Sequence, residues 1–284
     1  MTLRRPLKFE SIAGTISYTF PLGHLEMQEE VGLRTAFTSG VGADYSHDHH
    51  GYGIPPKGNR IINVRAMLVE STPTALADEM DEARGECYRI GLGYLYRIEA
   101  DGSTQRRCRA RVNAIPSITI SNLNLFGAAP IIIQFTAISD WMATTATTGS
   151  QTIDTPVESV TVNNPGNIPV TDVVWRLRNV GLTRAERPVL FNVTTGQYAA
   201  FLRPMGAADD ELYLDSGSRL VQFSTNDGAA YANDYSNFAG DFFRLDPGDN
   251  TIKVLCGRSV PLPFLSTIGT PNFTLEWSLY GRYV

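Results

Sequence analysis

The sequence predicts a mainly β protein with two domains: an N-terminal β-sandwich or barrel with one packed α-helix, and a C-terminal β-sandwich. Three observations support this prediction. Short runs of alternating apolar and polar residues recur along the chain, and turn signals separate them. The 25 glycines and 16 prolines fit frequent tight turns. Only one segment has apolar residues at convincing helical spacing.

The helix is expected directly after a strand over Arg60–Glu70. Thr72 is placed to cap its N-terminus, Pro73 suits its first position, and Gly91 ends it. Apolar residues at helical spacing form one stripe that we expect to face the core, namely Leu76, Met80, Ala83, Cys87 and Ile90.

A hairpin is expected after the helix. Asp101-Gly102 is a strong turn signal between strands over Tyr94–Glu99 and Arg106–Ile115. A further strand is expected over Ile131–Ile138. In the return strand of the hairpin, apolar residues alternate with arginines that therefore share one face of the sheet, namely Arg107, Arg109 and Arg111.

The boundary between the domains is expected in residues 143–156, a linker that begins with a small, polar, threonine-rich stretch without an apolar period. We therefore assign residues 1–142 to the first domain and residues 157–284 to the second. The second half contains strand and turn signals, with clear turns at Asn164–Asn167 and Asp246–Asn250. Short strands with frequent turns indicate a two-sheet sandwich of jelly-roll type.

Composition argues against several classes of function. The chain has 284 residues, 43% of them hydrophobic, which is enough for two ordinary cores. It has no apolar run long enough to span a membrane, and we expect no secretory signal at its start. A net charge of −5 with no basic half argues against a general nucleic-acid-binding module. Three cysteines without a CxxC spacing argue against a disulfide framework or a zinc knuckle.

One polar cluster is a weak candidate for a metal site, because His47, His49 and His50 surround Asp48. The cluster lies in a glycine-rich stretch, where adjacent imidazoles rarely converge on one point without a rigid scaffold. We therefore expect a solvated or subunit-contacting loop, with no resident metal and no cofactor.

Two further groups are candidate binding residues. The face that contains Arg107, Arg109 and Arg111 suits a contact between subunits, a solvated surface or a sequence-independent contact with DNA phosphates. Tyr231 and Tyr235 lie in a polar stretch and could stack on sugar rings. Aromatic residues in such a stretch are explained at least as well as anchors over the core, and we favour that interpretation.

No catalytic site is expected. The sequence has no GxSxG, HExxH or Walker motif, and no visible set of nucleophile, base and orienting residue. Acidic groups at Asp209–Glu211 and Asp246–Asp249 leave a hydrolase open as a distant alternative. Both groups lie at turns, where aspartate is favoured for backbone reasons.

The order of the features along the chain is itself informative. The first half has a strand, the helix, the Asp101-Gly102 hairpin and an apolar strand that ends near Trp141. The second half has two turn motifs, Val162–Asn167 and Phe243–Ile252, before a final aromatic strand with Trp277. This order resembles that of the distal tail proteins of long-tailed bacteriophages, which have a belt-like, ring-forming domain followed by a galectin-like one.

The resemblance implies a structural virion protein that is not an enzyme. Such proteins form a homo-hexameric ring that joins the tail tube protein to the tail hub, or tail-associated protein, and the receptor-binding protein. Genomic DNA meets the ring only in transit through its channel, and no membrane is contacted. The protein would be made in the host cytoplasm and reside at the distal end of the tail. The alternative is a carbohydrate-binding β-sandwich protein used in host-surface adsorption.

Overall fold

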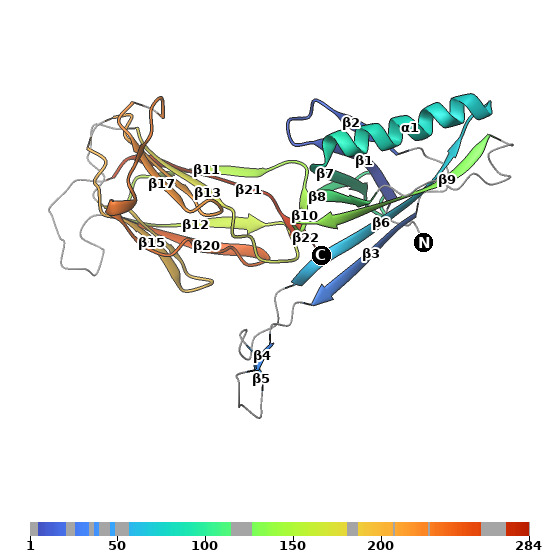
Figure 1. The fold of residues 1–284 in the computed structure, drawn as a ribbon. Helices are drawn as coiled ribbons and strands as arrows, with labels where there is room; N and C mark the ends of the chain where they lie inside the picture. The colour runs from blue at the N-terminus through green and yellow to red at the C-terminus, as the bar shows by residue number, and fades with distance from the viewer. Residues whose placement is uncertain are drawn as a thin grey trace. The chain divides into compact units, whose positions relative to one another are not determined.

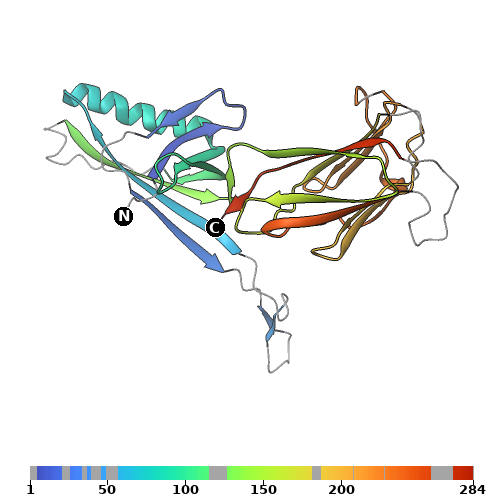
Figure 2. The ribbon, with the colours of Figure 1, turned by 180° about the vertical axis from the view of Figure 1, so that it is seen from behind.

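The computed structural model describes residues 5–20, 26–33, 37–39, 46–48, 57–114, 127–180, 187–206, 208–226, 228–256 and 271–283. The chain divides into two compact units, Met1–Trp141 and Met142–Val284. Strands dominate both units, as Figures 1 and 2 show, which confirms the mainly β class predicted from the sequence. Helix α1 (Pro73–Ile90) belongs to the first unit.

The first unit is built on one curled antiparallel sheet with α1 lying along one face (Figure 1). Its strands are ordered β2–β1–β7–β8–β9–β6–β3. Their bounds are β1 Arg5–Ser11, β2 Ser17–Thr19, β3 Glu26–Leu33, β6 Lys57–Val69, β7 Leu92–Ile98, β8 Gln105–Ala114 and β9 Ala128–Ala137. Two short strands, β4 (Phe37–Ser39) and β5 (Ser46–Asp48), pair with each other. The sequence predicted a sandwich or a barrel for this unit. The observed half-barrel is closer to the barrel.

Helix α1 begins and ends at the predicted residues. The side-chain oxygen of Thr72 accepts a hydrogen bond from the N–H of Ala75 at 3.2 Å, which satisfies one of the free donors of the first turn. Gly91 ends the helix with a φ of 58°, a conformation that side chains disfavour. The buried residues of the helix are Leu76, Met80, Ala83, Cys87 and Ile90, which confirms the predicted stripe. This stripe packs on β1, β2, β6 and β9.

The second unit is a sandwich of two antiparallel sheets (Figure 2). The six-stranded sheet has the order β11–β21–β13–β16–β17–β18, and the five-stranded sheet has the order β12–β20–β14–β15–β19. The two inner faces share one hydrophobic core, in which Trp175, Phe243 and Phe273 are fully buried. The bounds in the first sheet are β11 Thr147–Ile153, β13 Val174–Asn179, β16 Glu211–Asp215, β17 Leu220–Ser224, β18 Ala232–Asn233 and β21 Phe273–Leu279. Those in the second are β12 Val157–Asn164, β14 Val189–Asn192, β15 Gln197–Phe201, β19 Phe238–Gly240 and β20 Gly248–Leu255. The remaining elements are β10 (Trp141–Ala143), the 3-10 turn η2 (Tyr235–Asn237) and β22 (Arg282–Tyr283).

Half of the segment expected to be a linker, residues 143–156, forms strand β11. The strand pairs with β21 along its whole length, from Thr147 opposite Leu279 to Ile153 opposite Phe273. It lies at the edge of its sheet and buries only Ile153, so it needs no apolar period. Threonine has a β-branched side chain that favours an extended backbone, so the polar composition was misleading. The segment assigned as the linker therefore contains a strand, and its assignment as the boundary between the domains stays a prediction.

The two turn motifs of the second half lie side by side, because the end of β12 pairs with the start of β20. Each motif contains a buried asparagine that holds backbone groups together. The side-chain amide of Asn164 donates to the carbonyls of Ile168, at 3.0 Å, and Leu245, at 3.2 Å. That of Asn250 donates to the carbonyl of Asp246 at 2.7 Å. The motifs therefore build one end of the sandwich together.

The three cysteines lie among the described residues, are buried and form no disulfide. Burial raises the pKa of the Cys87 and Cys256 thiols to about 12, so neither thiol is activated as a nucleophile. In the described part of the chain, no helix has the length and apolar character that crossing a membrane demands.

Candidate functional sites

The sheet of the first unit has a polar face opposite the face that α1 covers. On β8, Cys108 and Ala110 are fully buried toward the helix, whereas Arg109 is exposed on the other side. The pairing of β7 with β8 places Tyr96 opposite Arg107 and Tyr94 opposite Arg109. We define the arginine face by the residues of β1, β7 and β8 on this side, namely Lys8, Glu10, Tyr94, Tyr96, Arg107, Arg109 and Arg111.

The arginine face is held together by contacts between cations and aromatic rings. The guanidinium of Arg107 lies 4.6 Å from the centre of the Tyr94 ring, and the ammonium of Lys8 lies 4.7 Å from that of Tyr96. Lys8 also donates to the Glu10 carboxylate at 3.0 Å. Partial burial acts to raise the pKa of Glu10, but the hydrogen bonds and the nearby cations bring it below its usual value. The face is therefore an ordered surface on which cations outnumber carboxylates.

The structure confirms that the three arginines share a face, because β8 alternates as predicted. The tyrosines were missed, although the signal for them was present. Tyr94 and Tyr96 alternate with the buried Leu95 in the strand before the Asp101-Gly102 turn. A hairpin pairs its two strands directly, so the tyrosines had to lie beside the arginines. Which partner this face contacts stays a prediction.

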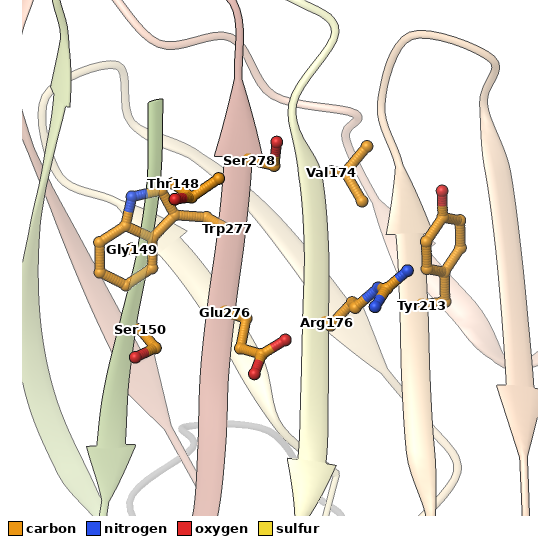
Figure 3. Close-up of a pocket in the computed structure, with 9 residues that line it drawn as sticks. All are labelled: Thr148, Gly149, Ser150, Val174, Arg176, Tyr213, Glu276, Trp277 and Ser278. Carbon is orange, nitrogen blue, oxygen red and sulfur yellow. The ribbon is translucent and has the colours of Figure 1, made fainter. Parts of the chain in front are cut away.

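A second candidate site is a hollow of about 620 Å³ on the six-stranded sheet of the second unit (Figure 3). Its lining residues come from β11, β13, β16 and β21, namely Thr148, Gly149, Ser150, Val174, Arg176, Tyr213, Glu276, Trp277 and Ser278. In the strand register, Arg176 lies opposite both Glu276 and Tyr213. These residues alternate with the buried Trp175 and Leu275, so they lie on the outer surface of the sheet.

Trp277 has the same parity as the buried residues Leu275 and Leu279. It is partly buried, packs against the core of the sandwich and also lines the hollow. A Cβ at Gly149 would lie 2.2 Å from Cζ2 of the indole, so the ring occupies the space of a side chain at that position (Figure 3). Glycine in the edge strand β11 therefore permits the close approach of this indole.

Charged and aromatic side chains beside the hollow contact one another. The guanidinium of Arg176 lies 3.9 Å from the buried Glu211 carboxylate and 5.6 Å from the centre of the Tyr213 ring. The hydroxyl of Tyr231 donates to the same carboxylate, and its ring centre lies 5.4 Å from that of Tyr213. Burial, that hydrogen bond and the charge of Glu211 raise the pKa of Tyr231 above its ordinary value.

The two tyrosines predicted to stack on sugars occupy different environments. Tyr231 supports Tyr213 and Glu211 beside the hollow, as described above. Tyr235 is 53% exposed and lies in an aromatic cluster, 6.1 Å from Phe242 and 6.0 Å from Phe238 between ring centres. The structure therefore does not bring the two rings to one site, and sugar stacking by either of them stays a prediction.

The structure describes only part of the candidate metal and acid groups. His47 lies in β5, and His49 and His50 lie outside the described residues. Within the described ranges, no group of three or more histidines, cysteines and acids is placed to hold a metal ion. Asp210 accepts a hydrogen bond from the N–H of Gly206 at 2.6 Å. Asp246 pairs with Arg244 at 3.2 Å, so these acids support local turns.

Comparisons with known proteins identify the fold. No protein-family model and no curated protein matches the sequence. The structure is similar to the crystal structure of the Dit (gp 19.1) protein of phage SPP1, which is described as a paradigm of the hub adsorption apparatus in phages that infect Gram-positive bacteria. The TM-score is 0.54 at 12% sequence identity, and the match covers 98% of this chain and 99% of that chain.

Two structures of the phage p2 baseplate in its activated conformation, one with strontium and one with calcium, match at TM-scores of 0.43 and 0.42. Each match has 10% identity and covers 96% of this chain and 98% of the other. The predicted resemblance to distal tail proteins is thus confirmed for the fold by the SPP1 structure.

Proposed function

We propose that this protein is a structural subunit at the distal end of a long-tailed phage tail. In this proposal it forms a homo-hexameric ring that connects the tail tube protein to the hub and its receptor-binding apparatus. The observation that supports it best is the similarity to SPP1 Dit, which extends over 98% of this chain and therefore includes both units. A shared fold alone does not define a function, so the ring has to be tested directly.

The first unit has a geometry that suits a ring. Strand β3 ends the strand order and pairs only with β6 among the described strands. An unpaired strand edge readily binds another chain, and repeated contacts of one kind close into a ring where the rotation permits. We propose that the belt-like first unit makes these contacts and that the galectin-like second unit projects from the ring.

The arginine face has a defined place in this proposal, at the contact between subunits or at the wall of the channel. In either place a cluster of cations on this face of the sheet would meet negative charge, from a neighbouring subunit or from DNA in transit. The contacts of Arg107 with Tyr94 and of Lys8 with Tyr96 would hold this surface in one shape.

The oligomeric state of the full chain tests the ring. Native mass spectrometry and negative-stain imaging of the purified protein should give hexamers and six-fold rings. A chain that stays monomeric at assembly concentrations would contradict the proposal.

The triple variant R107E/R109E/R111E tests the arginine face and should prevent ring assembly or tail attachment. A matched control reverses three cations of the second unit, in R219E/R244E/K253E, and should leave rings intact. Normal hexamers and infectious tails with R107E/R109E/R111E would contradict the proposed role of the arginine face. They would not contradict the hexameric ring.

A further inference from the structure

The side of helix α1 that points away from the sheet has two features that an uncovered helix does not need. Gly85 is exposed in the middle of the helix, and a Cβ added to it would meet open space, although glycine destabilises a helix relative to alanine. Tyr88 is 82% exposed, the highest value among the large hydrophobic residues that the structure describes. A second chain on this surface would bury the tyrosine and fill the space above the glycine. We define the helix outer face by its exposed residues at helical spacing, namely Asp78, Asp81, Glu82, Gly85 and Tyr88.

The helix outer face is acidic. Helix α1 contains five acidic and two basic residues, and each of its arginines already pairs with the acid three residues before it, at 3.3 and 2.7 Å. Asp78 and Glu82 are exposed and form no ion pair with any residue that the structure describes. Burial, and then the charges of Glu82 and Glu70, raise the pKa of Glu79 above its ordinary value. A partner of this face should therefore be basic, because its cations would meet carboxylates that have no counter-charge.

The arginine face has the complementary charge and lies on the other side of the same sheet. Arg109 and Arg111 are exposed, and neither forms an ion pair within the described ranges. Residues two apart on a strand are separated by about 6.7 Å, and residues four apart on a helix, such as Asp78 and Glu82, by about 6 Å along the axis. Two cations of one face therefore match two carboxylates of the other in number and in spacing.

Neither face suits a contact with a copy of itself. Two helix outer faces would bring carboxylates together, and two arginine faces would bring cations together, so charge repulsion opposes both self-contacts. A contact between the two different faces leaves one face of each kind free on every pair of subunits. The contact can therefore repeat from subunit to subunit, and it closes into a ring where the rotation permits.

We propose that the arginine face of one subunit binds the helix outer face of the next copy of the chain. Arg109 and Arg111 pair with Asp78 and Glu82 across this contact, and Tyr88 becomes buried in it. The inference rests on the ring proposed above and names the two surfaces that build it. It assigns the arginine face to the contact between subunits and not to the wall of the channel.

Mixing two charge-reversed variants of the full chain tests this contact. D78K/E82K has cations on both faces and R109E/R111E has carboxylates on both, so the yield of hexamers from either variant alone should fall at least about tenfold. An equimolar mixture should recover rings in which the two variants alternate, because each face then meets the opposite charge. Native mass spectrometry should accordingly find hexamers that contain equal numbers of the two variants.

A disulfide cross-link tests the same contact without relying on charge. On mild oxidation, the variant D78C/R109C should give a ladder of covalent oligomers up to the hexamer on a denaturing gel, because each subunit is linked to the next. The single variants D78C and R109C should give no ladder. The three native cysteines are buried and should not compete. A ladder that stops at the dimer would indicate a contact of like faces and would overturn the inference.

Two double variants of the second unit, D241K/D249K and R244E/K253E, reverse exposed charges away from both faces and should form rings like the parent protein. Rings formed by the parent and equally by D78K/E82K and R109E/R111E alone would overturn the inference and leave the ring intact. So would a mixture without rings, where circular dichroism shows that both variants are folded. If either charge variant fails to fold, the absence of a ladder from D78C/R109C overturns the inference. A parent protein that forms no rings would instead contradict the proposed function itself.

Discussion

The two units solve the problem of burying a sheet in different ways. The first covers one face of a single curled sheet with α1 and leaves the arginine face uncovered. The second packs two sheets against each other, so both inner faces are buried in one core and only outer faces meet solvent. A sheet with one polar face, and with an end strand whose outer edge pairs with no other described strand, is suited to contacts between subunits. A closed sandwich needs no partner for its core, so its outer surface is available for a ligand.

Substitutions in the two cores should have the largest effect on stability, and they test whether the two units differ as independent bodies. Trp175→Ala in the second unit and Phe135→Ala in the first each remove a fully buried aromatic side chain, and each should cost about 3–5 kcal/mol of stability. Because each unit has its own core, we expect the loss of amide protection to be confined to the unit that carries the change. Hydrogen exchange followed by mass spectrometry measures this, with β6 and β9 reporting on the first unit and β13 and β16 on the second. Equal losses in both units for either variant would show that the units fold as one body.

Buried asparagines should have the next largest effect. Asn250 is fully buried and donates to the carbonyls of Asp246 and Gly248 at 2.7 and 3.0 Å. Asn250→Ala leaves these backbone groups without that partner and should destabilise the second unit by about 1–3 kcal/mol. Asn163, whose side chain donates to Asp249 at the surface, is the control. Asn163→Ala should cost less than about 0.5 kcal/mol in urea denaturation. Similar costs for the two variants would argue against a special role for the buried amide.

These asparagines also show how much of the fold the sequence could predict. The motifs around Asn164 and Asn250 were recognised as turns, because proline, glycine and asparagine have strong backbone preferences. Their pairing across β12 and β20 was not predicted, since it joins residues far apart in the chain. Helix α1 and the β7–β8 hairpin were predicted well because their determinants are local. β11 was missed because an exposed edge strand needs little apolar pattern.

The candidate sites also divide into features that local sequence predicts and features that depend on contacts between distant strands. The arginine face was predicted from a single strand, whereas its tyrosines come from the neighbouring strand of the same hairpin. The hollow draws on four strands, and its formation depends on Gly149 admitting the indole of Trp277. No local pattern marks such a contact, so periodicity alone could not reveal it. Tyr231 was singled out for a polar stretch of sequence, but its place beside Tyr213 is a product of strand order.

The helix that distinguishes the first unit offers a smaller test. Thr72→Ala removes the side-chain acceptor of the Ala75 N–H and should destabilise the first unit by about 1 kcal/mol. Thr74, two residues further along the chain and inside the helix, is exposed and serves as the control. Thr74→Ala should be neutral or slightly stabilising, because alanine has the higher helix propensity. A denaturation midpoint lowered equally by both changes would show that the cap contributes nothing of its own.

The smallest effect concerns a turn that both units use. Asp101 in the first unit and Asp215 in the second each accept hydrogen bonds from the backbone N–H groups of the residues two and three positions further along the chain. The hydrogen bond from the Thr104 hydroxyl, together with those from the backbone, lowers the pKa of Asp101 to about 2. Its pKa in an unfolded chain is about 3.9, so the charged form stabilises the fold above about pH 4 and this contribution is lost as the pH falls toward 2. Asp101→Asn keeps an acceptor oxygen but no charge. The difference in Tm between the parent protein and this variant should therefore be constant above about pH 5 and shrink between pH 4 and pH 2. A difference that does not change with pH would show that the acceptor geometry, and not the carboxylate charge, stabilises the turn.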